Sequence, residues 1–449
     1  MISMLEDSMI PAVLPLCLCF ILVSCGGGWP EYTPPENHSI SVLTKQAELY
    51  ESLADGCSDG SLCEGNALLE RNRNLEKIAM MGTDGSADFD EIDHKYALLA
   101  KIAGLDGYQD DVQFGEPGED AYYRYPREMI YHPKVIAEVV KVFADFGYLH
   151  IRATPIKDGR HHMVSFESRV RPWTGYWHPV ASKPLSKGRK SVLAKLDRAL
   201  YAAYGVKSDI QGEELRRFRG YNPYGWEGRC DGLAFASILT AEPVQPLEFG
   251  GESFSVEDQK AVRVLAYMDV DYKQYGINYR GDADTDGTYQ DLKPEALHQI
   301  AWVQLGHRRK AFVVDESAKA EVWNKALFHY GWKAQHDKEA SIKGFADAYI
   351  VEANPWVIKQ RNILSDVATS QKDVLSITLR YRLYVDRSRK NTHGYRVIAG
   401  QWLGDSRENH FGNVKVVADD TQPNSTNSEM NKYIKFVRRG FLFSPGVAN

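Results

Sequence analysis

The sequence has no long run of basic residues and no internal repeat. Its basic residues form only short clusters such as Arg216-Arg217, and the 449-residue chain has a formal net charge of -6. Proteins bind nucleic acid by neutralising phosphates with lysine and arginine, so this composition argues against a nucleic-acid partner. With 43% hydrophobic and 25% charged residues, the chain has the composition of a folded protein. Its length leaves room for two or three domains of roughly 150 residues each.

The first nine residues contain no lysine or arginine, and the apolar stretch that follows ends at Val23. This stretch has the length of the apolar part of a signal peptide, and it is too short and too interrupted by proline to span a bilayer. The segment Leu22-Val23-Ser24-Cys25, followed by three glycines, resembles a bacterial lipobox. We therefore expect a signal peptide over residues 1–24, lipidation of Cys25 and a proline-containing tether over residues 25–40. Such a protein is exported and anchored to a membrane, in the periplasm, at the outer membrane or on the cell surface.

Cysteine is scarce, with six residues in the chain. Two of them lie in the expected signal peptide and Cys25 is expected to carry lipid. Cys57 and Cys63 flank a turn-rich loop that a disulfide could close in an oxidising compartment. Cys230 is then the odd thiol, which is the state that a nucleophile requires.

Cys230 lies where a glycine-rich turn passes into a run of small and apolar residues that predicts a helix. At a helix N-terminus, unpaired backbone N–H groups and the positive end of the helix dipole favour a thiolate. The small residues Gly232 and Ala234 would let this helix lie close to a sheet. The alternative is a buried structural cysteine, a common role for a free thiol.

A nucleophilic thiol needs a base and a group that orients the base. The segments on either side of a turn at residues 306–309 predict a β-hairpin. In the register set by a four-residue turn, His298 and Asp315 are diagonal neighbours on one face. A slip of one residue would place them on opposite faces, so the pairing depends on the turn.

Four blocks of sequence resemble the transglutaminase-elicitor family, within the transglutaminase-like branch of papain-type cysteine enzymes. They occur in the family's order and are residues 173–179 (WTGYWHP), 226–232 (WEGRCDG), 321–324 (EVWN) and 400–406 (GQWLGDS). This resemblance implies that Cys230 is the nucleophile, His298 the base and Asp315 the orienting acid.

The reaction implied by the resemblance is acyl transfer from a glutamine side chain of one protein to a lysine or another amine. The backbone N–H of Cys230 is the natural first donor to the oxyanion. Trp173, Trp177 and Trp226 are candidates for a second donor or for walls of the substrate groove, because an indole N–H can only donate.

Asp282, Asp284 and Asp286 are spaced like the first half of an EF-hand loop, with Gly287 at the sharp turn. Lys293 stands where a bidentate glutamate is expected. We predict that the reaction requires no cofactor and that these carboxylates form a candidate Ca²⁺ site. The alternative is an acidic turn exposed to solvent.

Outside these motifs, the sequence predicts an α+β fold with a helical N-terminal region over residues 41–150 and a papain/transglutaminase-like catalytic region over residues 151–449. The clearest expected helices are residues 67–80, 92–103, 134–146 and 191–204, and the clearest strands are 374–385 and 393–402. Two other functions stay open from the sequence. One is a papain-like cysteine peptidase or amidase that acts on protein or cell-wall peptide, and the other is a non-catalytic surface-binding lipoprotein.

Overall fold

The computed structural model describes most of the chain after residue 164 and two helices before it. The described ranges are 40–55, 62–81, 164–182, 185–276, 292–316, 321–342, 346–391, 394–407, 409–418 and 420–441, with isolated positions between 92 and 151.

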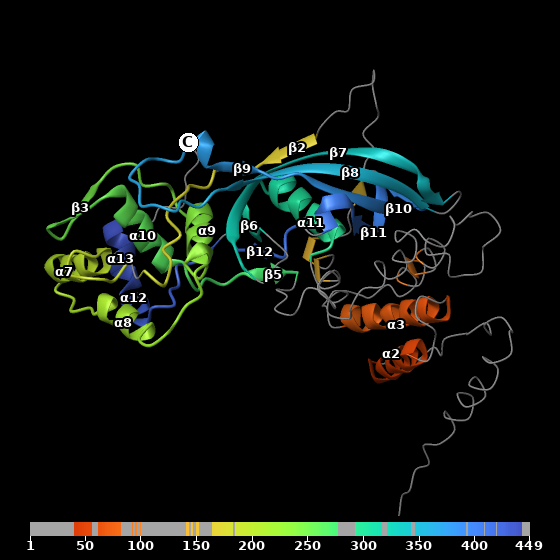
Figure 1. The fold of residues 1–449 in the computed structure, drawn as a ribbon, viewed down its shortest axis with the longest axis horizontal. Coiled ribbons are helices and arrows are strands. Elements are labelled where there is room, and N and C mark those ends of the chain that lie inside the picture. Colours follow the sequence, from red (N-terminus) through yellow and green to blue (C-terminus); the bar gives the residue numbers. More distant parts are fainter. Residues whose placement is uncertain are drawn as a thin grey trace, which may run out of the picture.

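One long antiparallel sheet forms the centre of the molecule (Figure 1). Its strand order is β1-β11-β10-β8-β7-β6-β12-β5, with β2 also paired to β7 and β9 to β8. The predicted strand at residues 393–402 is confirmed, and the predicted strand at 374–385 is divided between two strands, β9 and β10. The strands are β1 (His150–Ile151), β2 (Val164–Glu167), β5 (Lys273–Tyr275), β6 (Phe312–Asp315), β7 (Asn324–Ile342), β8 (Ala346–Ile358), β9 (Val374–Ser376), β10 (Leu379–Asn391), β11 (Gly394–Trp402) and β12 (Val414–Val416).

One face of this sheet buries a helix, α11 (Pro294–Ala301), which continues into the short π-helical turn η3 (Trp302–His307). Alternate residues of β7, namely Tyr330, Trp332 and Ala334, point into the same core as Leu297 and Ile300 of α11. This period of two is the pattern of a strand with one buried face. Short 3₁₀ turns, η4 (Gln371–Asp373) and η5 (Gly404–Arg407), precede β9 and follow β11.

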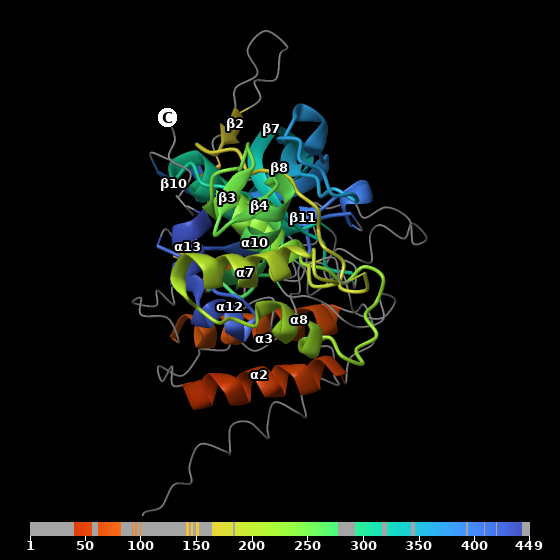
Figure 2. The ribbon, with the colours of Figure 1, turned by 90° about the vertical axis from the view of Figure 1, so that its left-hand side faces the viewer.

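A helical lobe lies at one end of the sheet (Figures 1 and 2). It has its own apolar core, which includes Leu196, Phe235, Val264 and Phe441. The predicted helix at residues 191–204 is confirmed as α7. Its elements are α7 (Val192–Tyr204), α8 (Ile210–Arg217), α9 (Cys230–Leu239), the hairpin β3–β4 (Leu247–Phe249 and Glu252–Phe254), α10 (Val256–Ala266), α12 (Ser428–Lys432) and α13 (Ile434–Phe441).

Local sequence signals set the limits of two of these helices. Ser191 caps the N-terminus of α7 through its side chain, and Gly205 ends α7 with a left-handed φ of 69°. Ser255 and Asp258 form a reciprocal capping box at the start of α10. The helical lobe therefore combines ordinary local signals with a buried apolar core.

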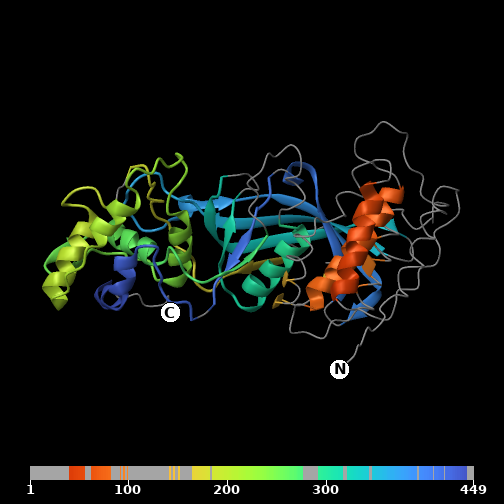
Figure 3. The same ribbon diagram turned by 90° about the horizontal axis from the view of Figure 1, so that it is seen from below.

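Two helices from the N-terminal region, α2 (Ile40–Asp55) and α3 (Leu62–Met81), lie at the end of the molecule opposite α7 and α8 (Figure 3). The predicted helix at 67–80 is therefore confirmed. Leu69 of α3 shares a small apolar cluster with Tyr384 and Ala399 of the sheet. An α+β architecture with an antiparallel sheet and a helical N-terminal part is thus the observed fold.

Candidate functional site

Cys230 is the first residue of α9, as the sequence predicts. The turn before it is tied down by the backbone, because Arg229 N–H donates to the Trp177 carbonyl at 2.8 Å. Gly228 allows this approach, since a Cβ at that position would lie 2.2 Å from the Trp177 ring. A Cβ at Gly232 would lie 2.3 Å from the Val264 carbonyl. Gly232 therefore permits close packing against α10, and α9 also packs against β7 of the sheet, as the sequence predicts.

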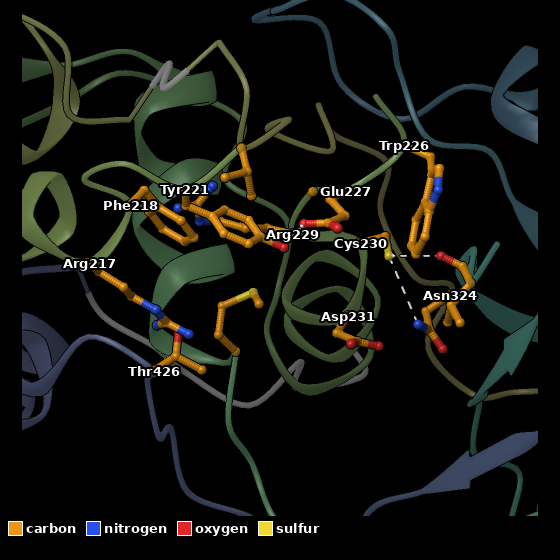
Figure 4. A pocket seen from close by; sticks show the side chains of 14 residues that line it. Arg217, Phe218, Tyr221, Trp226, Glu227, Arg229, Cys230, Asp231, Asn324 and Thr426 are labelled. Atoms are coloured by element: carbon orange, nitrogen blue, oxygen red, sulfur yellow. Dashed lines mark hydrogen bonds between the residues drawn. The ribbon is translucent and has the colours of Figure 1, made fainter. Parts of the chain in front are cut away.

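The thiol of Cys230 faces the start of β7 and the residues just before it. Its Sγ lies 3.7 Å from the Val322 carbonyl oxygen and 3.9 Å from Asn324 Nδ2 (Figure 4). The backbone N–H of Asn324 also donates to the sulfur. Asn324 is completely buried and was not predicted from the sequence. It belongs to the block 321–324, but only the fold shows that it meets a cysteine 94 residues away.

Burial dominates the acid–base state of this thiol. It raises the pKa of Cys230 to about 12, and the neighbouring Asp231 carboxylate adds to the rise. The two hydrogen bonds from Asn324 and the charge of Lys415 act in the opposite direction. The thiol is therefore protonated in this structure at neutral pH, and the groups that would favour its thiolate are Asn324 and Lys415.

A cavity of about 440 Å³ opens beside the thiol. Figure 4 shows Trp226 and Asn324 at the Cys230 end and Arg217 with Thr426 at the other end. Helical-lobe segments form most of the wall, and the first residue of the long strand β7, together with Val322 just before it, closes one side. The lining residues are Val180, Arg217, Phe218, Tyr221, Trp226, Glu227, Gly228, Arg229, Cys230, Asp231, Met268, Val322, Asn324 and Thr426.

The structure corrects the prediction for His298. Residues 294–301 form the helix α11, so the predicted hairpin is wrong. Pro294 occupies the first turn, and Leu297, Ile300, Ala301 and Leu305 recur at helical spacing. These signals distinguish a buried helix from a strand.

The His298 ring is buried in the sheet core and serves a different purpose. Its Nδ1 hydrogen-bonds the Tyr381 hydroxyl and lies 3.4 Å from the Tyr330 hydroxyl. Its ring also packs edge-on against Trp332 at 4.8 Å. In the described part of the chain, no histidine hydrogen-bonds to Cys230, and His298 does not hydrogen-bond to Asp315. The structure therefore brings His298 neither to the thiol nor to its predicted acid.

Asp315 ends β6 and is buried. It is the register partner of Asn324 across the β6–β7 pair. One carboxylate oxygen accepts from the Trp323 N–H at 2.8 Å, and the other lies 3.4 Å from Asn413 Nδ2. Asp315 therefore holds the segment that carries Asn324, rather than a histidine.

The structure separates the three candidate tryptophans. Trp173 is 2% exposed and donates its indole N–H to the Thr240 carbonyl at 3.0 Å, so it belongs to the core. Trp177 packs edge-on against Trp323, with ring centroids 5.4 Å apart. Trp226 lines the cavity with Cys230 and stacks on Tyr224. Among the three, Trp226 is the one positioned to meet a ligand in the cavity.

Several predicted positions lie outside the described residues. These are the candidate Ca²⁺ ligands Asp282, Asp284 and Asp286, the lipidation candidate Cys25, and Cys57 of the disulfide candidate; for Cys63, the structure describes only the backbone, in α3. Within the described ranges, no group of three His, Cys, Asp or Glu side chains is arranged to hold a metal ion. No described helix has the length and apolar character needed to cross a membrane.

Two ion pairs hold the residues on either side of Cys230. Arg229 pairs with Glu214, and both side chains are almost fully buried. Glu214 also accepts from Asn427 Nδ2 at 3.2 Å. On the other side of Cys230, Lys415 donates to Asp231 at 2.8 Å. The buried pair ties α8 and the segment before α12 to the residue that precedes the thiol.

Glu214→Gln is expected to destabilise the protein by about 3–5 kcal/mol, because it leaves the buried Arg229 charge without a counter-ion. Urea unfolding followed by circular dichroism measures this loss. The neighbouring Glu213→Gln is the matched control, since Glu213 forms a more exposed pair with Arg216 and should change stability by less than about 1 kcal/mol. Equal losses in the two variants would contradict the assigned role of the buried pair.

Comparisons with known proteins agree with the fold. Residues 211–430, which include Cys230 and Asn324, match the family model described as transglutaminase elicitor. The fold is similar to the crystal structure of the GP42 transglutaminase from Phytophthora sojae, with a TM-score of 0.50 and 16% identity over 68% of this chain and 98% of that chain. No curated protein sequence matches the chain. The fold is therefore transglutaminase-like, and residues 211–430 are similar to the transglutaminase elicitor family.

Proposed function

We propose that the protein is a transglutaminase-type aminoacyltransferase in which Cys230 is the nucleophile. One observation carries this proposal: the Cys230 thiol lies at the N-terminus of α9, beside a cavity of about 440 Å³, and receives two hydrogen bonds from Asn324. A helix N-terminus and hydrogen-bond donors both stabilise a developing thiolate.

The proposed reaction has two stages. Sγ of Cys230 attacks the γ-carboxamide carbon of a glutamine; the C–N bond breaks, the thiol proton leaves with ammonia, and a thioester forms. A lysine or another amine then attacks the thioester carbonyl, forms an amide, and returns a proton to the sulfur. N–H groups of the first turn of α9, including that of Cys230, would stabilise the oxyanion in both stages. In the resting structure the protonated thiol donates to the Val322 carbonyl at 3.7 Å, so a substrate that reaches the sulfur would displace this contact.

The proposed partners are proteins that present glutamine and lysine side chains, and nucleic acid is not among them. Anchoring through lipid on Cys25 would place these partners at a membrane surface. Ca²⁺ bound at residues 282–286 would act on the segment that leads into α11. These two features are proposed from the sequence alone.

The test is incorporation of a fluorescent primary amine into a glutamine-containing protein, with ammonia release measured in parallel. Transfer predicts amine incorporation in step with ammonia release, and mass spectrometry should find the acyl group on Cys230 when the amine is withheld. Ammonia release without incorporation would indicate a deamidase. Cleavage of the peptide backbone would indicate a peptidase or amidase, and either result would contradict the transferase proposal.

Asn324→Ala is expected to lower kcat/KM on the order of 10²-fold, because it removes a donor to the sulfur while the backbone N–H remains. Amine-incorporation kinetics measure this effect. The matched control is Asn354→Ala on β8, where the asparagine bonds to Ser376 and Trp356 and does not line the cavity. Equal kinetics for Asn324→Ala and the wild type would contradict the proposed role of Asn324 as a donor to the Cys230 sulfur.

A second candidate function is a non-catalytic binding protein that keeps the fold. The observation that favours it is the protonated thiol, which has no hydrogen bond to any histidine in the described residues. In that case the cavity would bind a peptide without turnover. Absence of both incorporation and ammonia release, with retained peptide binding, would select this function.

A further inference from the structure

An unpaired cation lies at the end of the cavity opposite Cys230. Arg217, the last residue of α8, lies beside Thr426 in Figure 4. Among the residues that the structure describes, none forms a hydrogen bond or an ion pair with its guanidinium. The adjacent Arg216 differs, because it bonds to Asp209 at 2.7 Å and to Glu213 at 3.1 Å. One of two neighbouring arginines is therefore structural, and the other is available to a ligand.

The carboxylates whose charges reach Arg217 already have partners. Asp269 and Glu213 act on Arg217 only through their charge. Glu213 accepts from Arg216 through one oxygen and from the Ser428 hydroxyl at 3.2 Å through the other. Asp269 accepts from Asn424. Arg217 is thus left to pair with a group supplied from outside the chain.

The cavity wall between Arg217 and Cys230 is mainly apolar and aromatic. It contains Phe218, Tyr221 and Met268. The Arg217 guanidinium also lies over the Phe218 ring, 5.4 Å from the ring centroid, which orients the cation without neutralising it. A ligand that spans the cavity therefore meets an apolar body with a thiol at one end and a guanidinium at the other.

The charge at this end of the cavity fits one carboxylate. The other cations near the cavity are engaged, since Arg229 pairs with Glu214 and Lys415 pairs with Asp231. A single planar guanidinium matches a carboxylate through two parallel hydrogen bonds. A site for phosphate esters would gather several donors. This cavity instead has Glu227 and Asp231 in its lining, and their negative charge disfavours a phosphate ester.

We propose that Arg217 selects acyl donors in which the reactive glutamine is accompanied by a nearby carboxylate, that is, acidic peptides. The carboxylate binds Arg217 while the glutamine side chain reaches Cys230 across the wall of Phe218 and Met268. This inference rests on the proposed function, which assigns Cys230 as the nucleophile that attacks the glutamine side chain. Arg217 itself acts by binding and takes no part in bond making or breaking.

Binding is tested without turnover in the Cys230→Ala protein. Fluorescence anisotropy compares two labelled glutamine peptides that differ only by aspartate against asparagine near the glutamine. We expect the acidic peptide to bind about tenfold more tightly, and we expect Arg217→Gln to remove this preference and Arg217→Glu to reverse it. Arg216→Gln is the matched control and should keep the preference. A preference that survives in Arg217→Gln would overturn the proposal.

Kinetics with Cys230 intact separate this proposal from the proposed function. In Arg217→Gln, kcat/KM for the acidic donor should fall about tenfold through a rise in KM. Turnover by the wild type without any preference for the acidic donor would refute the role of Arg217 and leave the transferase function in place. An acidic preference in binding, without turnover of any donor, would refute the transferase function and leave the Arg217 site in place.

Discussion

Replacing Cys230 with alanine is expected to lower amine incorporation by at least about 10³-fold, because removal of the nucleophile closes the covalent route. The oxyanion donors and the cavity would remain, and they cannot form a thioester. Incorporation of a fluorescent amine into a glutamine-containing protein measures the loss. Ammonia release should fall in parallel, because both products come from the same thioester.

The fold of the Cys230→Ala protein should be preserved, since the change removes one atom beside an existing cavity. Thermal unfolding checks this point. Ser237→Ala is a suitable control on the same helix: Ser237 is buried, bonds to the Ala234 carbonyl at 2.8 Å, and does not line the cavity. Substantial activity in Cys230→Ala would move the nucleophile to another residue.

Acid is expected to destabilise the protein steeply between about pH 6.5 and pH 3. Burial lowers the pKa of both His178 and His298 to about 3, with the Arg229 charge adding to the shift at His178. Below pH 6.5 the unfolded chain binds protons at these histidines and the folded chain does not. The contribution of the two histidines to stability is therefore fully present above their pKa in the unfolded chain, and it is lost as the pH falls toward their pKa in the folded protein. Each histidine lowers the free energy of unfolding by up to about 1.4 kcal/mol for each pH unit of acidification in this range.

Urea unfolding at several pH values between 7 and 4 measures this slope. His298→Phe should reduce the slope even if the variant is less stable overall, and His298→Gln gives a second variant in case the first does not fold. Burial raises the pKa of Glu257, which acts in the opposite sense, so the difference between variant and wild type is the quantity to compare. His307→Phe, at an exposed position, is the control. A slope that is unchanged in both His298 variants would contradict the conclusion that the buried His298 contributes to the acid sensitivity.

The sequence predicts the elements that depend on local signals. The glycine-rich turn before Cys230 predicts α9, and apolar periodicity predicts α3, α7 and β11. These features depend on residues that are neighbours in the chain. The order of strands does not follow from such signals.

The predictions that failed involve burial or distance along the chain. His298 was assigned to a strand because a short, fully buried helix resembles a buried strand in its apolar content. Asn324 was missed because its partner is Cys230, and a contact across 94 residues has no local signal. The cavity joins the end of α8, the start of α9 and the start of β7, so its shape follows only from the packing of the helical lobe against the sheet.

The long sequence separation at Cys230 also sets an order of events during folding. Val322 and Asn324, which cover the thiol, are 92 and 94 residues further along the chain. Contacts of this kind form after the local helices, because a long loop must close first. Until Val322 and Asn324 reach the thiol, it lacks the cover that they provide, and their share of the burial does not yet raise its pKa. The newly made chain therefore carries a more reactive cysteine than the finished protein, and completion of the sheet is the step that protects it from oxidants and unwanted thiol exchange.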